Sequence, residues 1–339
     1  MFKEVADIKT ADTLNLPTPT PHYHNVAVKP SDFQKAMVAE LGERTEKVRN
    51  NQVDASVDNM LKITNDGRKL ALDQRMINSL LPDFESSKIN ACIDNIFMIW
   101  QENADKKSAQ LVFCDLSTPK PDAEFSVYTD IRKKLIERGV PKSEISFIHE
   151  AKTEAQKQEL FKKVRKGEVR VLLGSTQKMG AGTNVQNKLI ALHDIDCPWR
   201  PSDLEQRSGR IIRQGNENTD VDIYRYVTEE TFDAYLYQLV EGKQKFASQI
   251  MTSKSPVRSA EDIDDTALSY AEIKMLATGN PYIREKMDLD IQVQKLRLYK
   301  SHYLSEKYEL EDKIIKFYPQ EISLLTARVD GLKADLEIA

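Results

Sequence analysis

Hydrophobic residues in the middle of the chain occur in short continuous runs that amphipathic segments separate. Five runs each predict a β-strand: "AQLVFCDL" (109–116), "EISFIHE" (144–150), "EVRVLLGS" (168–175), "KLIALHDID" (188–196) and "DVDIYRYV" (220–227). Helical periodicity occurs between them at about 123–138, 153–166 and 201–214. Continuous apolar strands that alternate with amphipathic helices indicate a parallel sheet covered on both faces. Such sheets bind ligands beyond the carboxyl ends of their strands, so we expect the chemistry there.

The N-terminal part of the chain has a different pattern. The stretch "LPTPTPHYHNVAVKP" contains four prolines, and residues 1–30 are therefore predicted to form an irregular arm. Ser31 caps a predicted helix over 31–49, in which apolar residues recur at helical spacing. A further helix is predicted at about 53–62, followed by a turn at "TNDGRK" (64–69).

The C-terminal part is predicted to be helical. "TEETFDAYLYQLVEGKQKFASQIM" begins with a Thr cap, and the polar "TSKSPVRSAEDIDD" that follows predicts a linker. Apolar residues then dominate a 4-3 spacing at Leu289, Val293, Leu296, Lys300, Tyr303, Lys307, Leu310, Ile314 and Phe317. The pattern resumes one residue out of phase at Ile322, Leu325, Val329, Leu332 and Leu336. This spacing predicts a coiled-coil seam with a kink or hairpin reversal at Tyr318–Pro319. Two helices packed on the body or on each other are the alternative to a partner-binding coil.

Composition narrows the class of protein. The chain has 339 residues, of which 40% are hydrophobic and 30% charged, which is enough for a sizeable core and for two domains. A net charge of -4 gives no global basic surface, so nucleic acid would have to be bound by a local patch. No long apolar run or leader pattern is present, and three separated cysteines suit a reducing compartment. We therefore predict a cytoplasmic protein without membrane contact. His22 and His24 lack nearby ligands in the sequence, and no metal site is predicted.

Two segments carry candidate chemistry, and the first is "LEQRSGRIIRQGN" (204–216). Read as a helix, it places Gln206, Arg210 and Arg213 at i, i+4 and i+7 on one face. The opposite face is apolar, with Leu204, Ser208, Ile211 and Ile212. A solvated helix face is the alternative, but no acidic residue lies at i±4 within the helix to pair with either arginine.

The second segment is "STQKMGAGTNV" (175–185), directly after a predicted strand. Gly180 and Gly182 allow the backbone to approach a ligand with its amides toward an anion. Ser175, Thr176 and Lys178 are residue types that bind phosphate. The sequence contains no G-x-x-x-x-G-K-[ST] phosphate loop and no D-E-x-[HD] motif for Mg²⁺. Trp199, between two prolines, is interpreted as a packing residue.

The order of these segments resembles the C-terminal RecA-like lobe of superfamily-two helicases, most of all the Swi/Snf-type DNA translocases. "LVFCD" resembles motif IV, "STQKMGAGTN" motif V and "QRSGRIIRQGN" motif VI, and "YRYVTEETFDAYLYQLVEGKQKF" is similar to the brace helix of that branch. The likeness covers residues 88–250, and it extends more loosely to the helicase polypeptides of bacterial mobile elements. Asn216 and Gly209 depart from the Swi/Snf pattern, which usually has Gln and often Asp at these positions.

The resemblance implies an α/β fold and a division into three parts. Residues 1–87 would be an N-terminal arm and helical segment, and residues 88–252 a parallel-sheet RecA-like lobe with its brace helix. Residues 253–339 would be a linker and a helical coiled-coil extension. ATP would be bound between this lobe and a first lobe that supplies the phosphate loop and the Mg²⁺ carboxylates.

Residue roles follow from the same resemblance. Arg213 resembles the arginine finger, with Arg210 as its companion and Gln206 at the interface. Gly180, Gly182 and Asn184 resemble nucleotide-binding and interlobe positions, whereas Ser175, Thr176 and Lys178 resemble contacts to the DNA backbone. The chain alone is expected not to hydrolyse ATP, and we favour a first lobe in the same longer polypeptide over one in trans.

Two other functions stay open at this stage. The chain could be a non-catalytic assembly module that presents its C-terminal coil to a protein partner. It could also be another nucleotide-binding α/β enzyme that clamps a small phosphorylated substrate.

Overall fold

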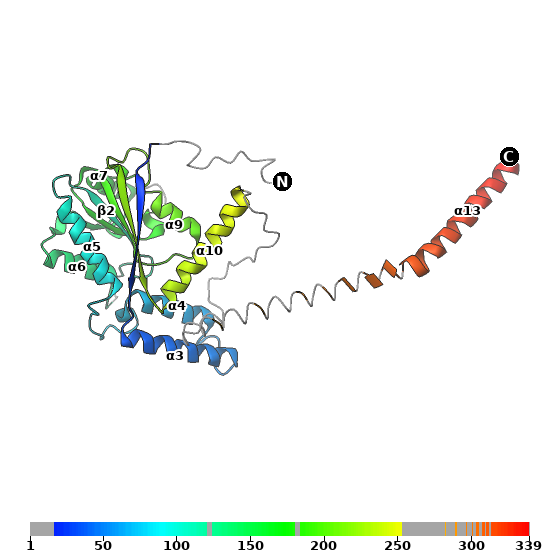
Figure 1. Cartoon of the computed structure of the whole chain (residues 1–339), viewed down its shortest axis with the longest axis horizontal. Coiled ribbons are helices and arrows are strands. Elements are labelled where there is room, and N and C mark those ends of the chain that lie inside the picture. The colour runs from blue at the N-terminus through cyan, green and yellow to red at the C-terminus, as the bar shows by residue number, and fades with distance from the viewer. Residues whose placement is uncertain are drawn as a thin grey trace. The chain divides into compact units, whose positions relative to one another are not determined.

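The computed structural model describes residues 17–120, 124–179, 184–252 and 313–338, and ten single positions between 282 and 311. The chain divides into two units, Met1–Gly279 and Asn280–Ala339. The first contains a six-stranded sheet in the order β1-β6-β5-β2-β4-β3, in which every neighbouring pair is parallel (Figure 1). Its strands are β1 (Thr20–Val28), β2 (Ala109–Phe113), β3 (Ile145–Phe147), β4 (Val171–Gly174), β5 (Leu189–Asp194) and β6 (Asp220–Thr228).

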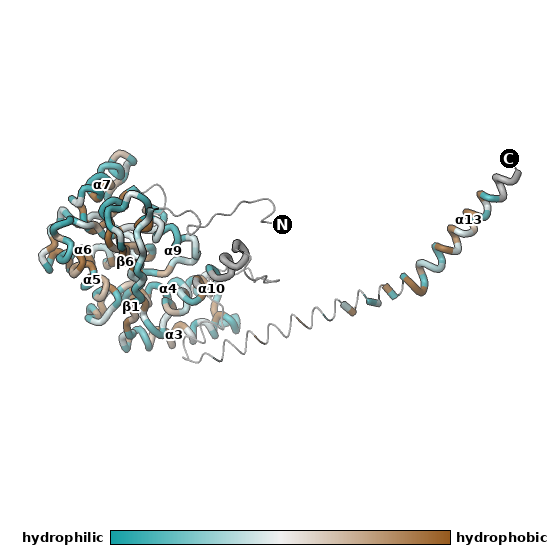
Figure 2. Tube along the Cα trace, turned by 45° about the horizontal axis from the view of Figure 1, so that its top comes forward, coloured by the Kyte–Doolittle hydropathy of each residue, from teal (hydrophilic) through white to brown (hydrophobic). Residues whose placement is uncertain are grey.

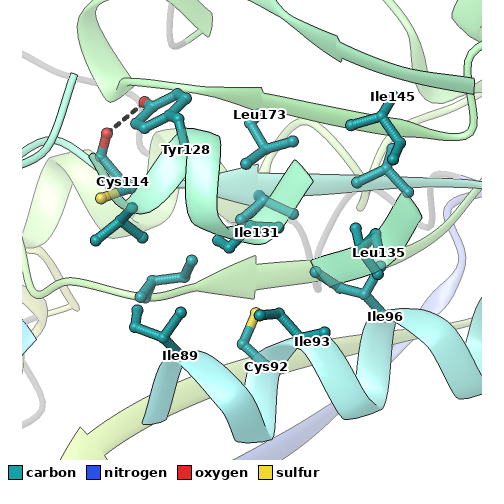
Figure 3. Packing of buried hydrophobic residues seen from close by; sticks show 14 of the residues in the cluster. Ile89, Cys92, Ile93, Ile96, Cys114, Tyr128, Ile131, Leu135, Ile145 and Leu173 are labelled. Atoms are coloured by element: carbon teal, nitrogen blue, oxygen red, sulfur yellow. Dashed lines mark hydrogen bonds between the residues drawn. The ribbon is translucent and has the colours of Figure 1, made fainter. Parts of the chain in front are cut away.

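Helices cover both faces of this sheet, as the apolar strands predicted. They are α3 (Asp32–Arg49), α4 (Met60–Leu72), α5 (Lys88–Glu102), α6 (Val127–Glu137), α7 (Glu154–Lys166), α8 (Thr176–Met179), α9 (Pro201–Ser208) and α10 (Phe232–Thr252). One core lies between the sheet and α5 and α6, where Ile93 and Ile131 meet Leu173 (Figure 3). A second core contains Phe161 of α7, and a third joins α3 and α4 to α10. The sheet, the capped helix α3 and the brace helix confirm the α/β prediction.

The predicted N-terminal arm is wrong for residues 20–28, because they form the edge strand β1 beside β6 (Figure 1). β1 is mostly exposed, so its sequence lacks the apolar run that marks the inner strands. His22 Nε2 donates to Asp220 Oδ1 at 3.0 Å, and His24 Nε2 donates to Asp222 Oδ1 at 2.7 Å. Each partner is about two hundred positions away in the sequence. In the described part of the chain, no group of three His, Cys, Asp or Glu side chains could hold a metal ion.

The predicted turn at 64–69 is also wrong, because "TNDGRK" lies inside helix α4. Asn59 caps this helix by accepting a hydrogen bond from the Lys62 backbone amide. A Cβ atom on Gly67 would lie 2.5 Å from the ring of Phe232, the first residue of α10. The glycine therefore allows α10 to pack closely on α4, and this tertiary contact outweighs its low helix propensity.

The second unit contains helix α13 (Tyr318–Ile338), preceded by a π-helical turn over Lys313–Phe317. A hairpin reversal at Tyr318–Pro319 is wrong, since the helical path continues through these residues (Figure 1). The linker predicted after residue 252 and the seam position Val293 lie outside the described residues, and the coiled coil stays a prediction. No helix in the described part of the chain is long and apolar enough to cross a membrane.

His193 generates a testable pH dependence of stability. It is fully buried on β5, where Nδ1 is 2.8 Å from the Tyr226 hydroxyl and Nε2 is 2.9 Å from Gln110 Oε1. Burial lowers the pKa of His193 to about 3, whereas an unfolded histidine titrates near 6.5. Between these values the unfolded chain binds a proton that the folded chain does not, so stability falls as the pH falls.

We expect this imidazole to contribute a slope of about 1.4 kcal/mol per pH unit between pH 6 and 4. Urea unfolding across this range measures the slope for the wild type and for His193→Gln, which should lack this contribution. His22→Gln, at the exposed edge strand, is the matched control and should keep the wild-type slope between pH 5 and 6. Equal slopes in the wild type and His193→Gln would show that another group titrates.

Candidate active site

Three neighbouring strands bring polar residues to one edge of the sheet. β2, β4 and β5 lie side by side and end at Phe113, Gly174 and Asp194. Asp115 follows the first strand and Thr176 follows the second. Because parallel strands end at the same edge, these side chains meet there, where α/β proteins bind ligands.

Arg207, on the last turn of α9, joins these strand ends. Its side chain is fully buried, and all five of its N–H groups donate hydrogen bonds. Nε donates to Thr176 Oγ1 at 2.8 Å, and Nη1 donates to Asp194 Oδ1 at 3.0 Å and to the Asp196 carbonyl at 2.9 Å. Nη2 donates to Asp115 Oδ2 at 2.8 Å and to Asp196 Oδ1 at 3.1 Å. One guanidinium therefore connects β2, β5, α8 and α9.

The carboxylates around Arg207 are themselves held by backbone groups. Asp196 Oδ2 accepts from the Asp115 and Leu116 amides at 2.5 and 2.9 Å. Asp115 accepts from the Thr176 amide at 2.6 Å and from its hydroxyl at 2.8 Å. Burial raises the pKa of Asp194, and the charge of Arg207 opposes that rise. Burial would lower the pKa of Arg207, but the Asp194, Asp196 and Asp115 charges raise it well above its usual value.

A cleft of about 590 Å³ opens above this network. It is lined by Asp115, Thr118, Ser175, Thr176, Gln177, Asp203 and Gln206. Three of the predicted site residues, Ser175, Thr176 and Gln206, thus come together, although they are about thirty positions apart in the sequence. The lining contains two carboxylates and no cation, so a phosphate in the cleft would need positive charge from its rim. Lys178 is exposed on α8 but does not line the cleft.

The two predicted catalytic arginines do not lie on a helix face as expected. Helix α9 ends at Ser208, and residues 209–215 form turns and bends. Arg210 is half-buried and Arg213 is exposed. The pKa of Arg210 is lowered by burial and by the charge of Arg213, so the two guanidiniums are neighbours.

The helix ends because its apolar residues pack into two different cores. Leu204 lies in the core with α4 and α10, whereas Ile211 is fully buried in the separate core that contains α7. The predicted single apolar face is therefore wrong. Asn216 secures the turn, since Nδ2 donates to the Leu189 and Ile211 carbonyls at 2.9 and 3.2 Å. Its departure from the Swi/Snf pattern thus has a structural role.

Of the remaining predicted site residues, only Asn184 is described, and it does not line the cleft. Gly180 and Gly182 lie outside the described residues. Asn184 is exposed, and its carbonyl accepts from Arg165 Nη1 at 2.6 Å. Trp199 packs against the α3–α4–α10 core with the Arg68 guanidinium 5.0 Å above its ring, in agreement with a packing role.

Sequence reasoning missed Arg207, Asp115, Asp194 and Asp196. The signal was weak but present, because carboxylates follow two strands in "CDL" and "DID", and an unassigned arginine lies beside Gln206. Nothing in the local sequence distinguishes this buried arginine from the two that follow it.

Replacing Arg207 tests whether the network holds the sheet edge together. Arg207→Lys keeps the charge but loses the planar fork, so one ammonium cannot replace all the hydrogen bonds to buried Asp194 and Asp196. We expect a loss of about 3–5 kcal/mol in the free energy of unfolding, measured by urea denaturation. Arg213→Lys, an exposed arginine on the next turns, is the matched control and should change it by less than about 0.5 kcal/mol. Similar losses in both variants would contradict the assignment.

A family model matches the central region of the chain. Residues 87–215 match the helicase conserved C-terminal domain. The uncharacterized ATP-dependent helicase YqhH of Bacillus subtilis (strain 168) is 27% identical over 229 residues, which are 65% of this chain and 38% of that protein. The chain thus covers well under half the length of this relative.

One solved structure supports the fold. The C-terminal part of the Fun30 ATPase domain superposes with a TM-score of 0.51 at 15% identity, over 80% of this chain and 99% of that one. The SWI2/SNF2 ATPase core of Sulfolobus solfataricus gives a TM-score of 0.49 at 16% identity, over 79% and 50% of the two chains. Residues 87–215 of this chain are therefore similar in sequence to the helicase conserved C-terminal domain, and the chain has the fold that the C-terminal part of the Fun30 ATPase domain also has.

Proposed function

We propose that this chain supplies the second half of the ATP site of a Swi/Snf-type DNA translocase. The observation that carries the proposal is exposed Arg213, which lies two residues after buried Ile211, with half-buried Arg210 between buried Arg207 and Ile211. A guanidinium held on an anchored turn at the surface can donate hydrogen bonds to an anionic γ-phosphate. Preorganised cations directed at developing charge are the main source of catalysis in phosphoryl transfer.

Each residue has a distinct part in this proposal. Arg213, exposed at the end of the turn, acts as the arginine finger, and Arg210 supports it. Gln206, at the rim of the cleft, contacts the interface with the other lobe. Gly180, Gly182 and Asn184 remain proposed nucleotide-side positions.

ATP would be held jointly with a first lobe. The sequence contains no phosphate loop, and the described residues offer no carboxylate group suited to Mg²⁺. Magnesium would therefore be bound by the first lobe, whether that lobe belongs to the same polypeptide or to another chain. In this division, the arginines of this lobe would bind the triphosphate, and the first lobe would bind the metal ion.

DNA would contact the rim of the cleft through its phosphates. Lys178 is exposed on α8 and supplies positive charge. Its backbone amide lies 3.4 Å from Ser175 Oγ. The Thr176 amide and hydroxyl both donate to Asp115. The Asp115 carboxylate therefore fixes the position from which Thr176 would contact a DNA phosphate. Contacts of this kind give sequence-independent binding that weakens with salt.

The exposed apolar residues of α13 support a second role, as an assembly module. A protein partner for this helix would act beside the motor function and does not replace it.

Arg213→Ala tests the arginine-finger assignment. With a first lobe supplied in cis or in trans, we expect DNA-stimulated ATP turnover to fall by about 10³–10⁵-fold, because γ-phosphate charge loses its stabilisation. Lys133→Ala, an exposed cation on α6, is the control and should keep wild-type turnover. Turnover of Arg213→Ala within a few-fold of the wild type would exclude the finger.

Lys178→Ala tests the DNA contact separately from hydrolysis. We expect weaker DNA binding and a plot of log K against log salt that is shallower by about one unit, since one phosphate contact is lost. Fluorescence anisotropy with duplexes of several sequences measures both quantities, again with Lys133→Ala as the control. An unchanged salt slope would show that Lys178 does not contact the DNA.

A further inference from the structure

The π-helical turn over Lys313–Phe317 lies where the apolar pattern of the sequence shifts by one residue. The 4-3 spacing ends within this turn, at Ile314 and Phe317, and after it the spacing resumes at Ile322 rather than at 321. A π-turn closes its hydrogen bonds over one more residue than an α-turn, so it absorbs one extra residue without a reversal. Pro319, which has no N–H to donate, lies directly after this turn.

The π-turn and α13 therefore form one helical path over residues 313–338, along which hydrophobic residues are drawn in brown (Figure 2). Every seam position described between 289 and 332 is exposed. Ile314 is 63% exposed, Phe317 55%, Ile322 63% and Leu325 49%. A repeating exposed stripe of this kind is typical of a helix that packs against another helix.

We propose that this stripe pairs with a second copy of the chain as an antiparallel coiled coil centred on the π-turn. The proposal deepens the assembly role and is independent of the ATP site, so either can fail alone. Antiparallel pairing that matches the two spacings places Lys300 against the partner's Leu332, and Tyr303 against the partner's Val329. It also places Lys307 against the partner's Leu325, and Leu310 against the partner's Ile322. In this pairing the π-turn of one chain lies opposite the π-turn of the partner, at the centre of the coil.

Charge selects this orientation over a parallel pair. In a parallel pair aligned in register, Lys300 and Lys307 at core positions would each face their own copy. Arg328 would also flank the partner's Lys333, a like-charge pair that costs stability. In the antiparallel pair each core lysine meets a leucine and can extend its ammonium into water. Lys313 then flanks the partner's Glu321, which is an opposite-charge pair that occurs twice in the dimer.

Cysteine cross-linking of the full chain tests both pairing and orientation. The native Cys92, Cys114 and Cys197 are buried, so disulfides between chains will form through the introduced cysteines. Under mild oxidation, a mixture of Tyr303→Cys and Val329→Cys chains should form mixed disulfide dimers, while each variant alone should stay uncross-linked. Cross-linking of each variant with itself indicates a parallel pair and overturns the proposal.

Light scattering, with variants in which the charges of Lys313 and Glu321 are swapped, tests the dimer without cysteines. The wild-type chain should be a dimer at micromolar concentration, and a monomer at that concentration would also overturn the proposal. Lys313→Glu should raise the dimer dissociation constant by roughly fivefold or more, and Lys313→Glu with Glu321→Lys should restore it to within about twofold. No effect of the single variant, or no recovery in the double variant, contradicts the antiparallel register.

Discussion

The buried guanidinium of Arg207 is the contact on which the carboxyl edge of the sheet depends. A charge with no exposure to water is tolerated only if all its donors find acceptors, and Arg207 meets this condition with five hydrogen bonds. Those acceptors come from β2, β5 and α8, which are far apart in the chain. The network is therefore a geometric requirement, because moving any one element leaves a buried charge unpaired.

The position of the candidate catalytic pair follows from this anchor. Arg207 fixes the end of α9, and Ile211 is buried in the core that contains α7. Arg210 lies between these two anchors and Arg213 lies two residues after Ile211, so both arginines belong to an anchored turn. Rigid placement of cations before the substrate arrives is what lowers the cost of stabilising charge in a transition state. The same anchor holds Thr176 and Asp115 in the wall of the adjacent cleft, so the two proposed binding surfaces share one support.

Much of the fold could be predicted because burial leaves a strong mark on sequence. Strands β2 to β6 are apolar enough to be recognised, and Ser31 and the brace helix carry ordinary helix signals. The failures have physical causes. β1 is an exposed edge strand whose pairing with β6 leaves no periodicity, and Gly67 is helical because Phe232 packs against it. The shift at Ile322 was visible in the sequence, but a π-turn absorbs it where a reversal was expected.

The sequence by itself determined the parallel α/β lobe, the order of its motifs and the residue types available for phosphate chemistry, because these depend on local periodicity and composition. Only the tertiary structure decided which arginine has which role. Arg207, Arg210 and Arg213 are equivalent as sequence letters, but one is buried among three carboxylates and two remain as a neighbouring pair near the surface. Burial and charge pairing depend on elements that meet only after folding, so no local pattern could separate the residue that holds the site from those proposed to act in it.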